Sequence, residues 1–242
     1  IENSESEYKK FGSVINDGRL AGLIDWDAIT DRTRPSRGNT HWASPSHIIK
    51  SAASQFRIDT RATQSDYVEV WVEKDALVGV LEKVCTELDV PYFSCRGYVS
   101  QSSMWEAAQR FIKQEEIGRR TRLIHLGDHD PSGIDMTRDI QDRLILFQSD
   151  CKVERIALTM AQIEAYNPPP NPAKLTDSRC QSYIASYGEK SWELDALDPK
   201  IISGLIEDSV GEYTDSRKRK ILLKRQDADR KKLNYVAEHC DE

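Results

Sequence analysis

The chain has 242 residues, 38% of them hydrophobic and 31% charged, which is typical of a globular protein with a substantial core and argues against disorder. The formal net charge of −6 is unlike that of a protein coated with positive charge for nonspecific nucleic-acid binding. Its apolar runs fall short of the ~18 residues that cross a bilayer, and its cysteines form no Cys-x-x-Cys pair, so we expect a cytoplasmic protein with no membrane segment, zinc site or disulfide framework.

The first 66 residues predict an N-terminal segment ahead of the main fold. It contains a short amphipathic helix followed by the sequence GLIDWDAI. The apolar residues of this sequence favour insertion into a core: Leu23, Ile24, Trp26 and Ile29. Residues 34–40 combine proline, serine and glycine, which is typical of a loop between two structured parts.

The first predicted strand ends on an acid. Residues 67–73 (YVEVWVE) alternate apolar and polar side chains and are rich in β-branched and aromatic types, so they predict a strand that ends at Glu73. Apolar residues then recur at helical spacing: Leu77, Val80, Leu81, Val84 and Leu88. Glu73 is therefore expected at a strand-to-helix turn, where an acid can also be a solvated strand end or a first-turn residue favoured by the helix dipole.

Two more strands follow, each with its own helix. Residues 91–95 predict a short strand, and 123–126 (LIHL) predict a buried strand that leads to Asp128 and Asp130. The helix between them has these inward-facing residues: Met104, Trp105, Ala108, Phe111 and Ile112. This alternation predicts an α/β fold with a parallel sheet and right-handed crossovers. Glu73 and the two aspartates should then converge at the carboxyl edge, where such sheets bind ligands.

Asp128 and Asp130 have two interpretations. On an extended backbone they point the same way, with Cα atoms within roughly 7 Å, so as exposed strand-end carboxylates they could share one divalent cation. Alternatively, Asp130 caps a helix that begins at Pro131. The cap explains Asp130 alone, and it leaves Asp128 and the small residues around the pair unexplained.

The last third of the chain carries further candidates. Residues 152–158 predict a strand, and Thr159 predicts the cap of a helix that ends near Tyr166. Prolines force 167–172 (NPPPNP) into an extended segment, which is either a rigid spacer or a loop that brings Lys174 and Arg179 toward phosphate.

Residues 199–242 predict a helical tail with a basic cluster. The cluster consists of Arg217, Lys218, Arg219 and Lys220. These residues could track nucleic-acid phosphates. The alternative is a long solvated helix, in which Asp227 and Asp229 offset part of the basic charge.

Three features of the strand ends occur together: Glu73 after the first strand, Gly97 after the second (CRGYVS), and the sequence DHDPSG after the third. This combination resembles the Toprim domain of topoisomerases, primases and related nucleases. The DHDPSG form is most similar to topoisomerase VI A subunits and the meiotic double-strand-break transesterases. By this resemblance, which covers roughly 67–147, residues 67–198 form the catalytic domain with an extension, and 1–66 include the trailing part of a winged helix.

The resemblance implies a metal-dependent enzyme. Glu73 would be the general acid/base, while Asp128 and Asp130 would hold Mg²⁺, with Mn²⁺ as an alternative. The sequence WELDAL at 192–197 is similar to a later strand end of the topoisomerase VI-like branch. The metal set is then Glu73, Asp128, Asp130 and Glu193. The expected nucleic-acid contacts are Arg96, Lys174, Arg179, Arg217, Lys218, Arg219 and Lys220.

The expected function is Mg²⁺-dependent cleavage of nucleic acid, with DNA favoured over RNA and hydrolysis favoured over attack by a tyrosine. In the resembling families that tyrosine lies on a preceding winged helix, and Tyr8 lacks the arginine-bearing context expected there. One alternative is the DNA-cleavage subunit of a type IIB topoisomerase-like complex that uses tyrosine transesterification, and another is a noncatalytic subunit that binds DNA or a partner. The expected partners are nucleic acid and either a second copy of the chain or a partner subunit. A haloacid dehalogenase-type phosphatase is a further alternative, because DHDPS nearly matches its Asp-x-Asp-x-Thr/Val strand, although that strand normally opens the domain.

Overall fold

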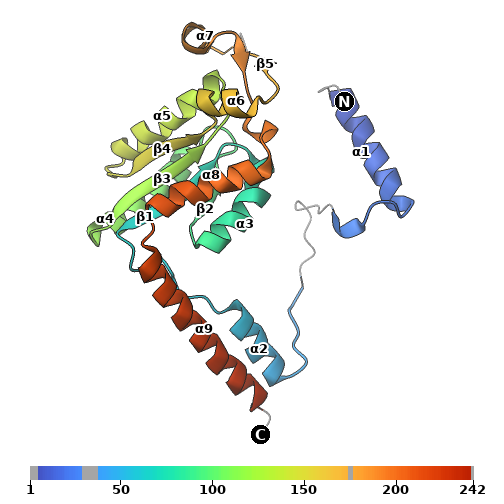
Figure 1. The fold of residues 1–242 in the computed structure, drawn as a ribbon, viewed down its shortest axis with the longest axis vertical. Coiled ribbons are helices and arrows are strands. Elements are labelled where there is room, and N and C mark those ends of the chain that lie inside the picture. Colours follow the sequence, from blue (N-terminus) through green and yellow to red (C-terminus); the bar gives the residue numbers. More distant parts are fainter. Residues whose placement is uncertain (1–4, 29–37, 174–176, 241–242) are drawn as a thin grey trace.

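The computed structural model describes residues 5–28, 38–173 and 177–240. Its centre is a four-stranded parallel sheet in the order β2-β1-β3-β4, flanked by helices (Figure 1). The strands are β1 (Asp66–Val72), β2 (Tyr92–Ser94), β3 (Arg120–Leu126) and β4 (Lys152–Ala157). β1 pairs with β3 along its whole length, which aligns the two strand ends. The predicted α/β class and parallel sheet are confirmed.

Helices cover both faces of the sheet. One face packs against α3 (Val78–Leu88), which follows the short turn η2 (Asp75–Leu77), and against α8 (Pro199–Glu212). The other face packs against α4 (Gln101–Glu116) and α5 (Pro131–Leu146). After β4 come α6 (Met160–Tyr166), β5 (Asn171–Pro172), α7 (Cys180–Tyr187), β6 (Lys190–Ser191) and the turn η3 (Leu194–Ala196). The described helices include none that is long and apolar enough to span a membrane.

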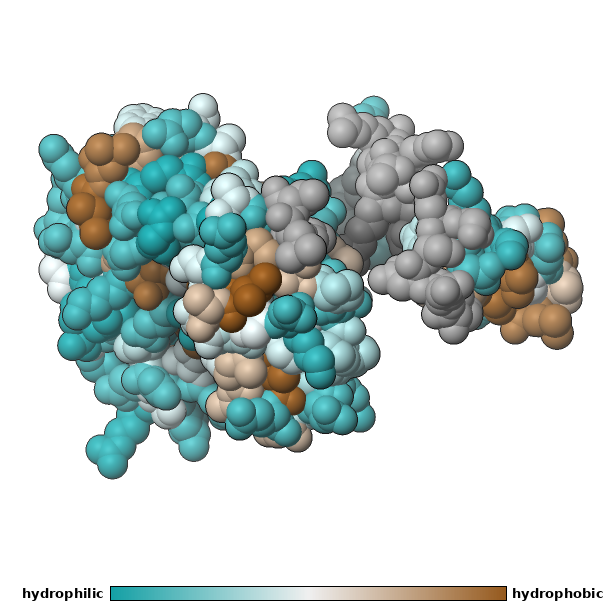
Figure 2. All heavy atoms as spheres, turned by 90° about the horizontal axis from the view of Figure 1, so that it is seen from above, coloured by the Kyte–Doolittle hydropathy of each residue, from teal (hydrophilic) through white to brown (hydrophobic). Residues whose placement is uncertain are grey.

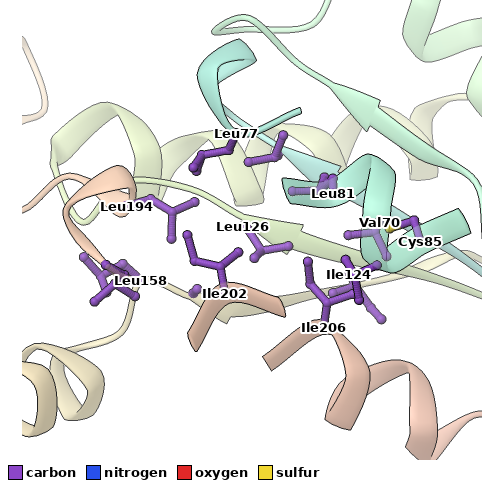
Figure 3. Close-up of a cluster of buried hydrophobic side chains, with 14 of the residues drawn as sticks. Val70, Leu77, Leu81, Cys85, Ile124, Leu126, Leu158, Leu194, Ile202 and Ile206 are labelled. Atoms are coloured by element: carbon purple, nitrogen blue, oxygen red, sulfur yellow. The ribbon is translucent and has the colours of Figure 1, made fainter. Parts of the chain in front are cut away.

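The face under α3 and α8 holds the larger apolar cluster. Alternate residues of β1 point into it and are fully buried: Val68, Val70 and Val72. Figure 3 shows Leu81 of α3 and Ile206 of α8 among the side chains gathered around these strands. We expected α8 to belong to a tail, but its apolar side is buried in this cluster, so it is part of the main fold.

The face under α4 and α5 buries the one acidic side chain that lies inside the sequence of the first strand's alternating pattern. Glu69 is buried there, and its carboxylate pairs with Arg110 at 3.0 Å. The Tyr67 hydroxyl and the Trp71 indole N–H also donate to it, at 2.9 and 3.0 Å. Glu69 is therefore a structural carboxylate whose charge is paired.

Trp105 of α4 does not face inward as predicted, because it is 52% exposed. The buried stripe of α4 runs through Met104, Ala108 and Phe111. Since one residue turns a helix by about 100°, the position after Met104 leaves this stripe and points toward solvent.

A two-helix arm extends from the sheet, formed by α9 (Ser216–Glu238) and α2 (Pro45–Gln55) (Figure 1). The Ser46 hydroxyl donates to Ala237 O at 2.6 Å, and the Ile58 N–H donates to the Gln226 side-chain oxygen at 3.0 Å. The end of the predicted N-terminal segment and the predicted tail therefore pack on each other.

The N-terminal segment consists of α1 (Glu5–Leu20) and the turn η1 (Trp26–Ala28). The prediction that its apolar residues enter a core is wrong, because Leu23 is 83% and Trp26 is 56% exposed. The segment instead folds back on its own helix, where the Arg19 guanidinium lies 4.5 Å from the Trp26 ring centroid. Hydrophobic side chains are visible on its surface in Figure 2. Ile29 lies outside the described residues.

Candidate functional site

Glu73 and Asp128 meet at the carboxyl edge of the sheet. The pairing of β1 with β3 continues past the strands, where the Glu73 N–H donates to Leu126 O at 2.9 Å. The Asp128 N–H in turn donates to Glu73 Oε2 at 2.9 Å. Parallel pairing therefore brings the first acid into contact with the backbone of the second, as the alternating pattern predicted.

Two glycines make this close approach possible. A Cβ atom on Gly127 would lie 2.9 Å from Glu73 Oε2, and one on Gly133 would lie 2.3 Å from the backbone oxygen of Asp128. Both positions need a residue without a Cβ atom, because a larger side chain would push the acids apart. This close packing explains Gly127 and Gly133, two of the small residues that capping leaves unexplained.

Asp130 is the N-cap of α5, as one interpretation of the sequence predicted. Its Oδ1 accepts from the Gly133 N–H at 2.6 Å and from the Ser132 hydroxyl at 2.9 Å. Pro131 occupies the first turn of the helix. Since both bonds use Oδ1, capping does not require the second carboxylate oxygen.

Lys74 lies among the acids and was missed by the sequence analysis. Its ammonium forms ion pairs with Glu193 and with Asp195, the latter at 3.0 Å, and it lies 3.5 Å from Asp128 Oδ2. Glu193 therefore joins the acidic cluster through this lysine. The available signal was the position of Lys74, directly after the strand-end glutamate.

A short bridge brings Glu193 and Asp195 to this edge. The His129 N–H donates to Trp192 O at 2.8 Å, and the Trp192 N–H donates back to His129 O at 3.0 Å. His129 is itself buried against Tyr183, whose hydroxyl lies 2.8 Å from its Nδ1. This histidine therefore orders the loop between the two aspartates, while its ring packs among aromatic residues.

Asp128 is buried, so the expectation of an exposed carboxylate is wrong for this residue. Its Oδ1 accepts from the Leu194 N–H at 2.7 Å, which satisfies one oxygen inside the protein. Burial raises the pKa of Asp128, while the Leu194 hydrogen bond and the Lys74 charge oppose that rise. A carboxylate can be buried here because these two partners compensate for lost water.

Glu73 has a pKa suited to proton transfer near neutrality. Burial and the neighbouring Asp128 charge raise its pKa to about 7, against the hydrogen bond from the Asp128 N–H. A side chain with a pKa near the working pH can both accept and release a proton. This property fits the acid/base role expected for Glu73.

Arg155, on β4, contacts the backbone of the loop that carries the aspartates. The sequence pattern did not predict this contact. Arg155 donates to the backbone oxygens of Gly127, Asp128 and Gly133 at 2.9, 2.5 and 2.9 Å. Burial lowers the pKa of Arg155, whereas the surrounding carboxylates Glu73 and Asp128 raise it. Its guanidinium therefore fixes the geometry of the loop and places a positive charge close to Glu73 and Asp128.

Two of the expected nucleic-acid contacts lie near this edge. Arg96 follows β2 and pairs with Asp75 at 3.0 Å, and it is mostly exposed. Arg179 pairs with Asp135 and with Asp177, both at 2.8 Å, and lies over the Tyr98 ring. Lys174 lies outside the described residues.

The basic cluster at the start of α9 lies at the opposite, amino edge of the sheet. Lys218 donates to Thr63 O at 3.3 Å, just before β1 begins, and Arg219 donates to Glu87 O near the end of α3. Asp215 caps α9 and its N–H donates to the Gln64 side chain at 2.7 Å. These basic residues therefore lie away from the acids instead of beside them.

The acids have the chemistry of a magnesium site, although within the described residues no three His, Cys, Asp or Glu side chains are arranged to hold a metal ion. Carboxylate oxygens are the hard ligands that Mg²⁺ prefers. The residues that would hold the ion are Asp128, Asp130 and Glu193, with Glu73 next to them. In their present arrangement the Lys74 ammonium supplies the positive charge between Asp128 and Glu193.

The chain matches no protein-family model, no curated protein and no solved structure. Its function is therefore inferred from the residues at the sheet edge and their contacts.

Proposed function

We propose that this protein is a Mg²⁺-dependent enzyme of the Toprim type that cleaves nucleic acid by hydrolysis, with DNA as the favoured substrate. The observation that carries the proposal is the contact between Glu73 and Asp128 at the carboxyl edge of a parallel sheet, where the Asp128 N–H lies 2.9 Å from Glu73 Oε2. Asp130 stands two residues further along the same loop. Convergence of acids at this edge is what phosphodiester chemistry with a divalent cation requires.

The surroundings of each acid suggest a different role for it in the proposed reaction. Glu73, whose pKa is raised to about 7, would move a proton at the attacking or leaving oxygen. Asp128, Asp130 and Glu193 would provide oxygen ligands. Mg²⁺ would supply positive charge next to the phosphodiester and so offset the repulsion between the acids and the nucleic acid.

Lys74 fits this proposal as a countercharge. Three carboxylates within reach of one ammonium would repel one another without it, and its ion pairs hold them together. Its flexible side chain can move aside when a cation binds, because Lys74 reaches the acids through four methylene groups.

The test is a cleavage assay with purified protein and Mg²⁺ or Mn²⁺ on supercoiled, linear and single-stranded DNA and on RNA. We expect cleavage that stops with a chelator and in Asp128→Asn. Asp142→Asn, which changes an exposed acid of α5 paired with Arg138, is the matched control and should keep full activity. Equal rates in Asp128→Asn and the wild type would refute the proposal.

A second candidate is a noncatalytic subunit that binds DNA or a partner, and one observation favours it. Lys74 already neutralises part of the acidic cluster by ion pairs, as in a structural charge network. Calorimetry with Mn²⁺ separates the two candidates. Binding that is lost in Asp128→Asn supports the enzyme, and no binding to the wild type supports the noncatalytic subunit.

A further inference from the structure

A cavity lies at the amino edge of the sheet, away from the acids. Its volume is about 410 Å³, which is within the range of small-ligand sites. Its walls come from the loop before β1, the start of β1 and the ends of α3 and α4. The residues that define it chemically are Arg57, Arg61, Tyr67, Asp89, Gln114 and Arg119.

The three arginines of this cavity are hydrogen-bonded to neutral acceptors. Arg61, which is 4% exposed, donates to the Thr214 hydroxyl at 2.9 Å and to Tyr213 O at 3.3 Å. Arg119 donates to the Gln114 side chain at 2.8 Å and to backbone oxygens at 3.0 Å. Arg57 donates to Ser54 O at 3.0 Å and to Phe56 O at 3.1 Å.

The acids in the same wall are occupied by other partners. Asp89 Oδ2 accepts from the backbone N–H and the hydroxyl of Thr60, at 2.7 and 2.6 Å. Asp59 Oδ1 accepts from the Arg61 backbone N–H at 2.8 Å. Among the residues that the structure describes, no carboxylate lies within 4.0 Å of the three guanidinium groups. The two acids therefore use these hydrogen bonds for backbone and hydroxyl groups, and their charges offset only part of the three positive charges.

We propose that this cavity binds a phosphate group. A buried guanidinium without a carboxylate partner is costly, and an anion within the cavity would compensate for that cost. Guanidinium groups bind phosphate through paired hydrogen bonds, and the Tyr67 ring with Val68 and Pro91 gives an apolar wall for the rest of the ligand. The phosphate belongs either to a small molecule or to the backbone of a nucleic acid.

The electrostatics agree with an anion site. Burial, followed by the charges of Arg119 and Arg219, lowers the pKa of Arg61 to about 10, against the smaller opposing effect of the Asp89 and Asp59 charges. Positive charge thus accumulates around Arg61 from three sides of the fold: the loop before β1, the end of α4 and the start of α9. This site lies apart from Asp128, so its function does not depend on the proposed cleavage.

The test is isothermal calorimetry in the presence of a chelator at constant ionic strength. The probes are inorganic pyrophosphate and, separately, a short single-stranded DNA oligonucleotide. The variants are Arg57→Gln, which changes an exposed arginine, and Arg119→Gln, with thermal unfolding as a check on its fold. Lys152→Gln, an exposed lysine at the same edge outside the cavity, is the matched control, and Asp128→Asn tests independence from the acids.

We expect binding to weaken about tenfold in each arginine variant and to stay unchanged in Lys152→Gln and Asp128→Asn. This pattern with pyrophosphate identifies a small-molecule site, and the same pattern only with the oligonucleotide identifies a backbone contact. If neither probe binds the wild type, or if both arginine variants bind as the wild type does, the proposal is wrong. Loss of binding in Asp128→Asn would assign the anion to the other edge and would also overturn it.

Discussion

At the scale of single residues, the acidic edge depends on which atoms are already hydrogen-bonded. Asp128 uses Oδ1 for the Leu194 N–H, and Glu73 uses Oε2 for the Asp128 N–H. Each carboxylate thus has one oxygen fixed by the protein, which orients the other. The fixed bonds determine both how substitutions act on stability and how each acid titrates.

Asp128→Asn and Asp128→Ala should differ in stability. Asparagine keeps an oxygen that can accept from the Leu194 N–H, whereas alanine leaves that buried donor without a partner. An unsatisfied buried donor costs about 1–3 kcal/mol, so we expect the alanine variant to unfold more easily by that amount. Urea unfolding of the two variants measures the difference, and equal stabilities would show that the hydrogen bond contributes nothing.

Glu73 should make the metal-free protein less stable as the pH rises. Its folded pKa of about 7 lies above the ordinary value of 4.5, so the folded state holds more protons than the unfolded state between these values. The free energy of unfolding should therefore fall across this window by an amount on the order of 3 kcal/mol, and stay level above it.

Glu73→Gln should flatten this fall, leaving only the contributions of other groups such as Asp128, whose pKa is also raised. Urea unfolding at several pH values, with a chelator present, makes the comparison. Identical pH profiles for the variant and the wild type would contradict the raised pKa.

At the scale of elements, strand ends and helix starts share the same residues. Asp130 ends the loop after β3 and begins α5, and Lys74 stands between β1 and η2. The start of α9 shows the opposite arrangement, since its basic residues contact the amino edge of the sheet. The location of each element therefore decides whether its charges can act at the acidic site.

Asp130→Ala should weaken α5 even without metal. It removes the oxygen that accepts from the Gly133 N–H and from the Ser132 hydroxyl. Loss of such a cap typically costs about 1 kcal/mol. Asp130→Asn is the control, because asparagine caps equally well; thermal unfolding should rank alanine below it, and the same midpoint for both would refute the capping role.

Replacing Arg217, Lys218, Arg219 and Lys220 by glutamine should weaken DNA binding and flatten its salt dependence, if the start of α9 tracks phosphates. Each lost phosphate contact reduces the slope of log K against log salt by about 0.9. The control changes four other exposed basic residues of α9: Lys224, Arg225, Lys231 and Lys232. An unchanged slope in the first variant would leave α9 as a solvated helix.

At the scale of the whole molecule, the two candidate sites lie at opposite edges of the sheet. The acids gather at the carboxyl edge, and the arginine cavity with the start of α9 lies at the amino edge. α8 runs along one face of the sheet and connects the acidic site, which includes Glu193 and Asp195, with the basic start of α9. This separation allows the two sites to be tested independently.

The choice between hydrolysis and attack by a tyrosine is also a property of the whole chain. Tyr8 lies on α1 and is exposed, in a segment whose apolar residues Leu23 and Trp26 are also largely exposed. We predict cleavage without a covalent adduct between protein and DNA, because a nucleophile must be held close to the scissile phosphate. Denaturing gels of reactions with labelled DNA test this, and a labelled protein band that disappears in Tyr8→Phe would establish the tyrosine mechanism.

Local patterns were sufficient to predict the elements of the sheet and the capping role of Asp130. Alternation in 67–73 and helical spacing after it predicted β1 and α3, and Asp130 with Pro131 predicted the start of α5. These features are set by residues close in sequence, through backbone geometry and burial. The convergence of Glu73 with Asp128 also followed, because parallel strands align their carboxyl ends.

Contacts between distant residues could be decided only by the tertiary structure. Lys74 meets Asp195 across 121 positions, and Lys218 meets Thr63 across 155, so no local period encodes either contact. The burial of Asp128 likewise depends on its contact with Leu194. The exposure of Trp26 depends on how its segment packs against the rest of the chain. The sequence gives the chemical type of each side chain. Its hydrogen-bond partners and its burial are set by tertiary packing, which depends on the whole chain at once.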